Sequence, residues 1–252
     1  MNLPDIGIIL ADTSRSRAYL RALVRNNLLP NFALVLEDDS GGALPGQVKQ
    51  SSVEPFSKAI SELDDCWAEI NYDHTFSIKS ELNRLSIPYK TSMSKDINIP
   101  LVLDILRQRE ESVFIYSGFG GALLRKDILS LGKHFLHVHG GYLPAFKGST
   151  TNYYSLLVEN TIGASSIFLS EEIDSGPILM RQKFPAPTDR QGIDHIYDSA
   201  ARSKVLIDTL NRYVAKGEWE FDLPNNVGGE TYYIIHPVLK HIAILDKENV
   251  SK

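Results

Sequence analysis

The sequence predicts an α/β fold, a doubly wound and mostly parallel sheet with a small β element near the C-terminus. Three observations support this prediction. Short, continuous apolar runs, typical of strands buried on both faces, occur at residues 6–11, 32–37 and 112–118. Amphipathic helical stretches alternate with these runs, as in parallel strands joined by crossover helices. The chain has 252 residues, of which 43% are hydrophobic and 23% charged, so it can form one large core.

The first half of the chain begins with a strand–helix–strand unit. The run IGIILA at residues 6–11 predicts a buried strand, and Thr13 or Ser14 can cap the helix that follows it. The turn-rich stretch at residues 38–47 predicts a mobile loop. Beyond it, the patterns predict helices at residues 56–70 and 77–85 and a short strand at 87–90. A helix that starts with Pro follows at 100–108, and a buried strand at 112–118.

The second half continues the alternation and then changes. Three further strands are predicted, the last two on either side of the turn EEIDSG, at residues 134–139, 164–170 and 177–184. A long amphipathic helix follows, because one stripe contains Ile193, Ile196, Ala200, Ile207, Leu210 and Val214. The run TYYIIHPVLKHIAIL at residues 231–245 predicts one or two strands. We therefore divide the chain into an α/β domain, residues 1–217, and a small β appendage, residues 218–252.

Charge and composition exclude several classes of protein. The net charge of −5 leaves no basic excess for phosphate groups, so neither nucleic acid nor an anionic membrane is an expected partner. No apolar run approaches the ~20 residues that cross a bilayer. The N-terminal residues lack the basic region of a secretory signal, and the single cysteine, Cys66, can form neither an internal disulfide nor a Cys-based zinc site. A cytoplasmic location is therefore expected.

Two groups of residues follow predicted strands, at the edge where ligands bind to such sheets. The glycine-rich GFGG comes after one strand, at residues 118–121, and HGG, residues 139–141, ends another. The GFGG glycines allow close approach of a ligand to the backbone, or they only form a tight turn. Asp174 lies between two strands in EEIDSG, where the simplest interpretation of such an Asp is an Asx-turn.

The two histidines of HVH raise the question of a metal site. His137 and His139 are two residues apart, so on a strand both face the same side and can ligate zinc or iron. No third and fourth ligand is evident in the sequence, and we expect no metal. A buried, hydrogen-bonded imidazole is the alternative interpretation, above all for His137. The GFGG loop is not Gly-x-Gly-x-x-Gly, which argues against a dinucleotide site.

Three motifs resemble those of the folate-dependent formyltransferases. HVHGGYLPAFKG resembles the family's Asn-x-His-(Pro/Gly)-Ser-Leu-Leu-Pro-x-x-(Arg/Lys)-Gly signature, and EEIDSGPIL resembles its Asp-x-Gly-x-Ile motif. SGFGGALLRKDIL is similar to the family's loop over the pterin. The motifs occur in the family's order, and the resemblance covers about residues 5–215. It implies a Rossmann-like sheet of the formyltransferase type and 10-formyltetrahydrofolate as the formyl donor, with no metal.

The resemblance also implies roles for individual residues. His139 matches the family's catalytic histidine, and Asp174 matches its catalytic aspartate. His137 stands where the family has a nearly invariant Asn, and its imidazole N–H can still donate to the oxyanion of the tetrahedral intermediate. The pterin is expected to contact Phe119, Gly120, Gly121, Ala122, Leu123 and Ile173. The acceptor is expected to contact Gly141, Tyr142, Lys147, Ser14 and Arg15.

The predicted function is transfer of a formyl group to the amine of a small molecule, with an amino-sugar nucleotide as the favoured acceptor. Methionyl-tRNA enzymes of this family usually have a further C-terminal domain, and glycinamide ribonucleotide enzymes have a glycine-rich phosphate loop that ADTSRSR lacks. The C-terminal appendage resembles one that assists dimerisation in small sugar-nucleotide enzymes, so a homodimer is considered. The alternatives are a formyltetrahydrofolate hydrolase and a catalytically impaired folate- or nucleotide-binding protein, the latter suggested by His137.

Overall fold

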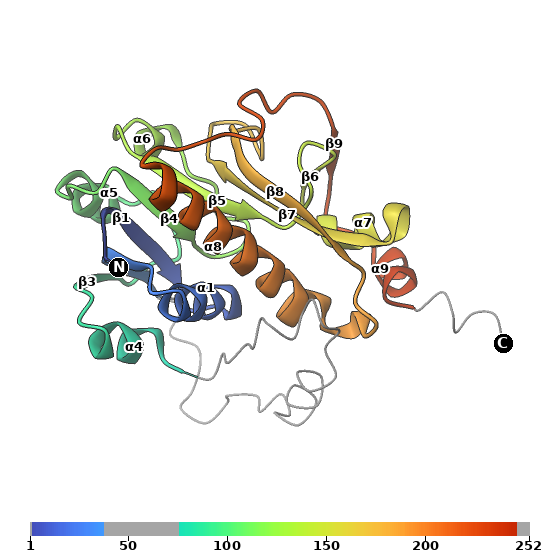
Figure 1. Cartoon of the computed structure of the whole chain (residues 1–252), viewed down its shortest axis with the longest axis horizontal. Helices are drawn as coiled ribbons and strands as arrows, with labels where there is room; N and C mark the ends of the chain where they lie inside the picture. The colour runs from blue at the N-terminus through green and yellow to red at the C-terminus, as the bar shows by residue number, and fades with distance from the viewer. Residues whose placement is uncertain (1, 38–75, 246–252) are drawn as a thin grey trace.

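The computed structural model describes residues 2–37 and 76–245, so the expected loop at 38–47 and helix at 56–70 lie outside the described residues. Its central feature is a seven-stranded sheet with the order β3-β2-β1-β4-β5-β7-β8, which passes through the middle of the molecule (Figure 1). In chain order these strands are β1 (Asn2–Ala11), β2 (Leu29–Leu36), β3 (Tyr89–Ser92), β4 (Val113–Ser117), β5 (His134–His139), β7 (Thr161–Phe168) and β8 (Ile178–Pro185).

The pairing of the strands confirms the predicted doubly wound, mostly parallel sheet. From β3 to β5 all neighbours are parallel, whereas β7 is antiparallel to both β5 and β8. The order reverses at β1, which has β2 on one side and β4 on the other. Such a reversal opens a crevice at the carboxyl ends of the strands concerned. A ligand site is therefore expected where β1 and β4 end.

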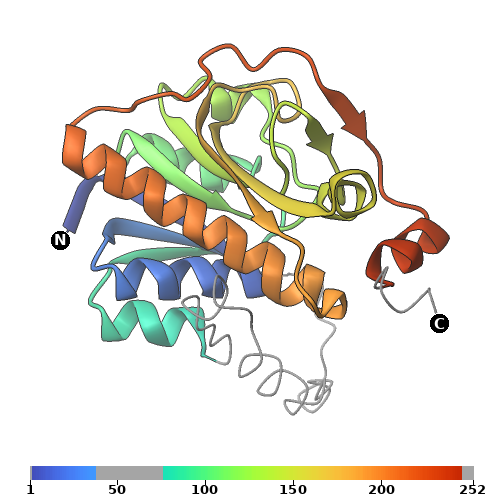
Figure 2. The same cartoon turned by 45° about the vertical axis from the view of Figure 1, so that its right-hand side comes forward.

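Helices cover both faces of the sheet, and each face has its own apolar core. On one face lie α1 (Ser14–Arg25), α4 (Ile78–Arg84) and α8 (Asp198–Lys216), and α1 and α8 run side by side (Figures 1 and 2). On the other face α5 (Pro100–Arg107) and α6 (Lys126–Leu129) pack on a second cluster. Because both faces are covered, the central strands are apolar on both sides, as their sequences predict.

Local chemistry sets several helix ends. Thr13 caps α1, because its side chain accepts a hydrogen bond from the backbone N of Ser16 at 3.2 Å. Pro100 occupies the first turn of α5. The long helix predicted from residue 193 is divided, since Ile193–Tyr197 form a π-helical turn and α8 begins at Asp198. Such wider turns inside helices occur frequently at functional sites.

The C-terminal run contains one short strand. This strand, β9 (Glu230–Tyr232), pairs in parallel with β6 (Phe146–Gly148) rather than with the main sheet. Gly148 and Gly229 lie at this contact, and both have positive φ. An added Cβ at either glycine would overlap a backbone oxygen of the opposite segment, so the two segments approach each other too closely for side chains there.

The remainder of that run forms a helix, α9 (Pro237–Ile244), instead of the second strand that its apolar residues allowed. Pro237 is pre-organised for a first helical turn, and the His236 side chain accepts a hydrogen bond from Val238 N at 3.3 Å. Packing beside α7 (Thr151–Glu159) outweighs the strand preference of the tyrosines and isoleucines (Figure 2). No helix in the described ranges is long and apolar enough to cross a membrane.

Candidate active site

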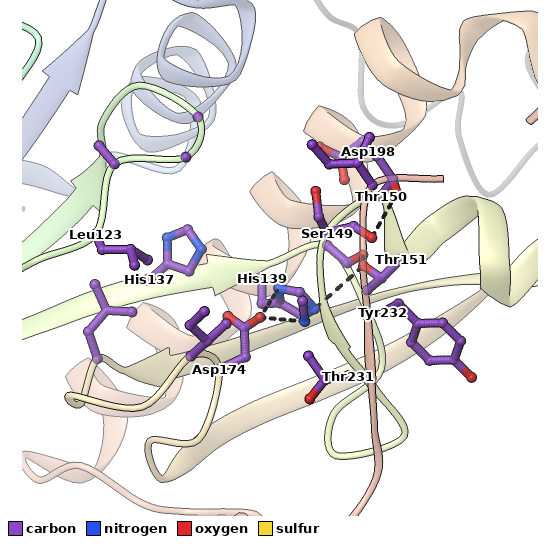
Figure 3. Close-up of a pocket in the computed structure, with 18 of the residues that line it drawn as sticks. Leu123, His137, His139, Ser149, Thr150, Thr151, Asp174, Asp198, Thr231 and Tyr232 are labelled. Atoms are coloured by element: carbon purple, nitrogen blue, oxygen red, sulfur yellow. Dashed lines mark hydrogen bonds and ion pairs between the residues drawn. The ribbon is translucent and has the colours of Figure 1, made fainter. Parts of the chain in front are cut away.

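A pocket of about 630 Å³ lies at the carboxyl ends of the central strands (Figure 3). Its walls come from the first turn of α1, the glycine loop after β4, the end of β5, the segment after β6, the β7–β8 loop, the start of α8 and the segment around β9. Elements from both ends of the chain therefore meet at the crevice where the strand order reverses.

Most residues that the sequence placed in the site line this pocket. The predicted pterin contacts do so, namely Phe119, Gly120, Gly121, Ala122, Leu123 and Ile173. The predicted catalytic residues and one predicted acceptor contact also line it, namely His137, His139, Asp174 and Arg15. Four other predicted acceptor contacts are not among the residues that line it: Ser14, Gly141, Tyr142 and Lys147.

His139 and Asp174 form the chemical centre of the pocket. Nδ1 of His139 lies 3.3 Å from Oδ2 of Asp174, and both side chains are almost fully buried (Figure 3). On the other side of the ring, Nε2 is 2.8 Å from the carbonyl oxygen of Phe146. A carbonyl oxygen can only accept, so Nε2 carries a proton. Nδ1 and the carboxylate would then both be acceptors, and we infer that one proton is shared between them.

The shared proton makes this pair suited to acid–base chemistry. Burial lowers the pKa of His139, and the neighbouring Asp174 carboxylate opposes this effect by favouring the imidazolium. The backbone N of Gly148 donates to Oδ2 of Asp174 at 2.8 Å and so stabilises negative charge on that oxygen. The described part of the chain supplies no hydrogen bond to Oδ1 of Asp174, which leaves that oxygen for a ligand.

Asn226 holds the loop that carries Asp174. The Asp174 backbone has φ 51°, in the left-handed region that Asp tolerates better than most residues. The buried amide of Asn226 donates to the carbonyl oxygens of Asp174 at 2.7 Å and Gly176 at 3.0 Å. Nζ of Lys147 donates to the Asn226 carbonyl at 3.2 Å and to Ser175 Oγ at 3.4 Å. Lys147 therefore supports the loop instead of facing the pocket.

Replacing Asn226 with Ala is expected to lower the melting temperature and the turnover number together. The change leaves two carbonyl oxygens without their donor, at a cost of about 1–3 kcal/mol for a buried group, and it releases the Asp174 loop. Asn225→Ala is a matched control, because Asn225 is the neighbouring residue of the same type and is exposed. Thermal unfolding and turnover measured on both variants check the prediction, and equal values for the two would contradict it.

A second polar network, which the sequence analysis did not include, underlies the pocket. Arg202 donates from Nε to Asp198 Oδ2 at 2.8 Å and from Nη1 to the Val138 carbonyl at 2.6 Å. Nδ2 of Asn152 donates to Asp198 Oδ1 at 2.8 Å. A Cβ at Gly140 would overlap the Asp198 and Arg202 side chains, so this network requires a glycine after His139. The available sequence signal was the spacing of Asp198 and Arg202, four residues apart on one helix.

Arg15 reaches the pocket from the first turn of α1. Its Nη2 donates to the Gly118 carbonyl at 2.5 Å, and its Nε donates to Ser117 Oγ at 3.4 Å. Burial lowers the pKa of Arg15, and the positive charge of Arg202 lowers it further. These contacts tie the glycine loop to α1 and leave a guanidinium at the wall of the pocket.

His137 lies on the same face of β5 as His139, and its Nδ1 is 3.4 Å from the carbonyl oxygen of Tyr116. Burial lowers the pKa of His137 well below its ordinary value of 6.5, and the positive charges of Arg15 and Arg202 lower it further, so the ring is neutral. Within the described ranges, no group of three or more His, Cys, Asp or Glu side chains could hold a metal ion.

Gly141 and Tyr142 have structural positions just outside the pocket. A Cβ at Gly141 would lie 2.7 Å from the Phe146 carbonyl oxygen, the same oxygen that accepts from His139. A side chain there would disturb that hydrogen bond. The ring of Tyr142 instead contacts Arg181, whose guanidinium carbon is 4.8 Å from the ring centroid. This residue therefore belongs to the wall behind the pocket.

Fold and site together define a class of protein. A doubly wound α/β sheet has a crevice with a glycine loop on one side and a buried His–Asp pair on the other, an arrangement suited to group transfer with acid–base control. Residues 80–207, just over half of the chain, match the family model described as formyl transferase. The chain belongs to the formyl transferase family, as the three sequence motifs implied.

Comparison with curated relatives is consistent with this membership. The chain is 28% identical over 144 residues to a methionyl-tRNA formyltransferase of Synechococcus sp. (strain JA-3-3Ab), which covers 56% of this chain and 43% of that protein. It is 31% identical over 126 residues to a methionyl-tRNA formyltransferase of Chloroflexus aurantiacus, which covers 48% of this chain and 39% of that protein. The matched region is therefore less than half of these relatives' length.

Solved structures confirm the predicted fold. The phosphoribosylglycinamide formyltransferase from Anaplasma phagocytophilum superimposes with a TM-score of 0.56 at 13% identity, covering 92% of this chain and 98% of that one. A 4-N formyltransferase from Francisella tularensis gives a TM-score of 0.55 at 14% identity, covering 96% and 86% of the two chains. At these identities the likeness concerns the fold.

Proposed function

We propose that the protein transfers a formyl group from 10-formyltetrahydrofolate to the amine of a small molecule, with an amino-sugar nucleotide as the favoured acceptor. The observation that carries the proposal is the buried His139–Asp174 pair, with Nδ1 and Oδ2 3.3 Å apart, inside a pocket bounded by the glycine loop. Membership of the formyl transferase family supports the formyl group as the unit transferred.

Formyl transfer needs a proton donor and a proton acceptor close to the formyl carbon. The amine attacks the formyl carbon, its oxygen becomes an oxyanion, and the bond from that carbon to the folate nitrogen breaks. The attacking nitrogen loses one proton and the leaving nitrogen gains one. We assign the proton shared by His139 and Asp174 to the leaving nitrogen, and such general acid–base catalysis contributes ~10²–10⁴-fold.

The glycine-loop half of the pocket fits a flat ring. Gly120 and Gly121 have open space where a Cβ would lie, and Gly121 has φ 79°, a conformation that favours glycine. Leu123 is 60% exposed at the pocket wall (Figure 3). Ile173, which also lines the pocket, is 52% exposed. Apolar side chains left this accessible on facing loops suit a ligand that covers them. A pterin has this shape.

The other half of the pocket is lined by residues that carry hydroxyl groups, which suit a sugar: Ser149, Thr150, Thr151 and Thr231 (Figure 3). A solved sugar 3N-formyl transferase with the same fold was crystallised in the presence of dTDP and 5-N-formyl-THF, and it superimposes with a TM-score of 0.55 at 14% identity. These observations support an amino-sugar nucleotide as acceptor.

The stable analogue 5-formyltetrahydrofolate is expected to raise the melting temperature. At a hundredfold excess over Kd, binding to the native state adds about 2.7 kcal/mol, which for a chain of this length corresponds to about 5–10 °C. Thermal unfolding with p-aminobenzoylglutamate, which lacks the pterin, is the control. No shift with the analogue, or an equal shift with the control, would contradict pterin binding at the glycine loop.

A second candidate acceptor is methionyl-tRNA, because the curated relatives that match in sequence are methionyl-tRNA formyltransferases. One assay separates the candidates: release of tetrahydrofolate from 10-formyltetrahydrofolate is followed with an amino-sugar nucleotide, with charged initiator tRNA, and without acceptor. Release that requires the sugar amine supports the proposal. Release that requires tRNA supports the second candidate, acceptor-independent release indicates a hydrolase, and binding without release indicates a non-catalytic protein.

A further inference from the structure

We propose that His137 acts as a hydrogen-bond acceptor, through Nε2, for an N–H of the attacking amine, and takes up the proton that this nitrogen loses. The inference rests on the proposed function, since it assigns a role within formyl transfer. It differs from the role expected from the sequence, in which a ring N–H of His137 donates to the oxyanion. Figure 3 shows His137 in the same cavity as the His139–Asp174 pair.

The hydrogen bond at Nδ1 decides which ring nitrogen carries the proton. Nδ1 of His137 lies 3.4 Å from the carbonyl oxygen of Tyr116, a residue of β4, the strand beside β5. A carbonyl oxygen only accepts, so Nδ1 is the protonated nitrogen. Because the neutral imidazole has a single N–H, Nε2 has none. That nitrogen therefore has a lone pair to offer and no proton to donate.

The surroundings of His137 favour the neutral ring. Arg15 approaches from α1 and Arg202 from α8, His139 is two residues along the same strand, and the Tyr116 carbonyl faces Nδ1. The two guanidinium groups oppose positive charge on the imidazole while the site is at rest, so the ring takes up a proton only as negative charge develops on the formyl oxygen. The described residues provide no hydrogen bond to Nε2, and the side chain lines the pocket. Nε2 is thus a lone-pair acceptor that faces the ligand space.

The two histidines can then divide the proton transfers. As the carbon–nitrogen bond to the amine forms, the proton leaves that nitrogen for Nε2 of His137. As the bond to the folate nitrogen breaks, its electron pair stays on that nitrogen, which receives the proton shared by His139 and Asp174. The site ends with one proton more on His137 and one fewer on the pair, and exchange with water restores it. The formamide and tetrahydrofolate account for every atom.

The tautomer is tested directly by nitrogen-15 NMR of the full-length protein with labelled histidine. The His137 signals are identified by their loss in a His137→Gln variant. The expected spectrum shows a proton on Nδ1 and an unprotonated Nε2 at neutral pH. A proton on Nε2 would overturn the inference whatever the activity of the protein, because that nitrogen could not accept.

Two variants test the role in turnover. Asn places its amide near Nδ1 and can keep the contact with Tyr116, but it has no atom near Nε2; Gln extends far enough to offer an oxygen there. We expect His137→Asn to lower kcat by ~10²–10⁴-fold, and the kcat of His137→Gln to lie between those of His137→Asn and the wild type. The KM for the folate should change little in both variants. Equal kcat in His137→Asn and wild type would overturn the role. Absence of transfer by the wild type would refute the proposed function itself.

Discussion

Asp174→Asn is expected to lower the turnover number at least about a hundredfold, while folate still binds. The amide keeps the size of the carboxylate but cannot hold the proton shared with His139, whose Nδ1 lies 3.3 Å away. Removal of a general acid or base typically costs ~10²–10⁴-fold. Single-turnover rates with saturating formyl donor measure the chemical step, and the thermal shift with 5-formyltetrahydrofolate reports whether the pocket is intact.

His139→Gln should give a loss of similar size, and the double variant should be little worse than either single one. Groups that act as one unit are strongly non-additive, since loss of either disables the pair. Asp104→Asn is the matched control, because Asp104 is an exposed residue of α5 that pairs with Arg107 away from the pocket. Losses that multiply in the double variant, or an active Asp174→Asn protein, would contradict a shared proton.

Gly148→Ala is expected to reduce both stability and activity by disturbing the contact between β6 and β9. Gly148 has φ 95°, and its added methyl group would overlap the backbone oxygen of Tyr232. Left-handed backbone alone costs a non-glycine residue about 1–2 kcal/mol. The overlap adds to this cost and shifts the backbone N–H that donates to Asp174. Thermal unfolding and turnover are the measurements.

The variant Gly132→Ala is a control that separates the cost of left-handed backbone from the cost of the atomic overlap at Gly148. Gly132 has φ 71°, and nothing lies within 4 Å of the position its Cβ would take. The control therefore carries the same kind of backbone penalty without a collision and outside the pocket. A markedly larger loss for Gly148→Ala supports the close contact with β9, and the same loss for both variants with normal turnover would count against it.

Sequence patterns were sufficient for much of the fold because the information is local. Continuous apolar runs such as those at residues 6–11 and 112–118 predict strands covered on both faces, and both are central strands. The glycine loop and the His139 segment follow such strands, and parallel strands bring their carboxyl ends to one edge. The helix α9 was missed because its residues also favour strands, and its packing beside α7 is a long-range contact.

The chemical state of the site depends on contacts between distant segments, which no local pattern contains. Which nitrogen of His137 carries the proton follows from the Tyr116 carbonyl on the neighbouring strand. The loop that carries Asp174 is held by Asn226, a residue to which the sequence assigned no role. Lys147 has the charge of a ligand contact but is buried under that same segment. Residue type and spacing were enough to suggest His137, Asp174 and Lys147 as site residues. The tautomer, the burial and the hydrogen-bond partners of these side chains are set by contacts between distant segments, which form only when the chain folds.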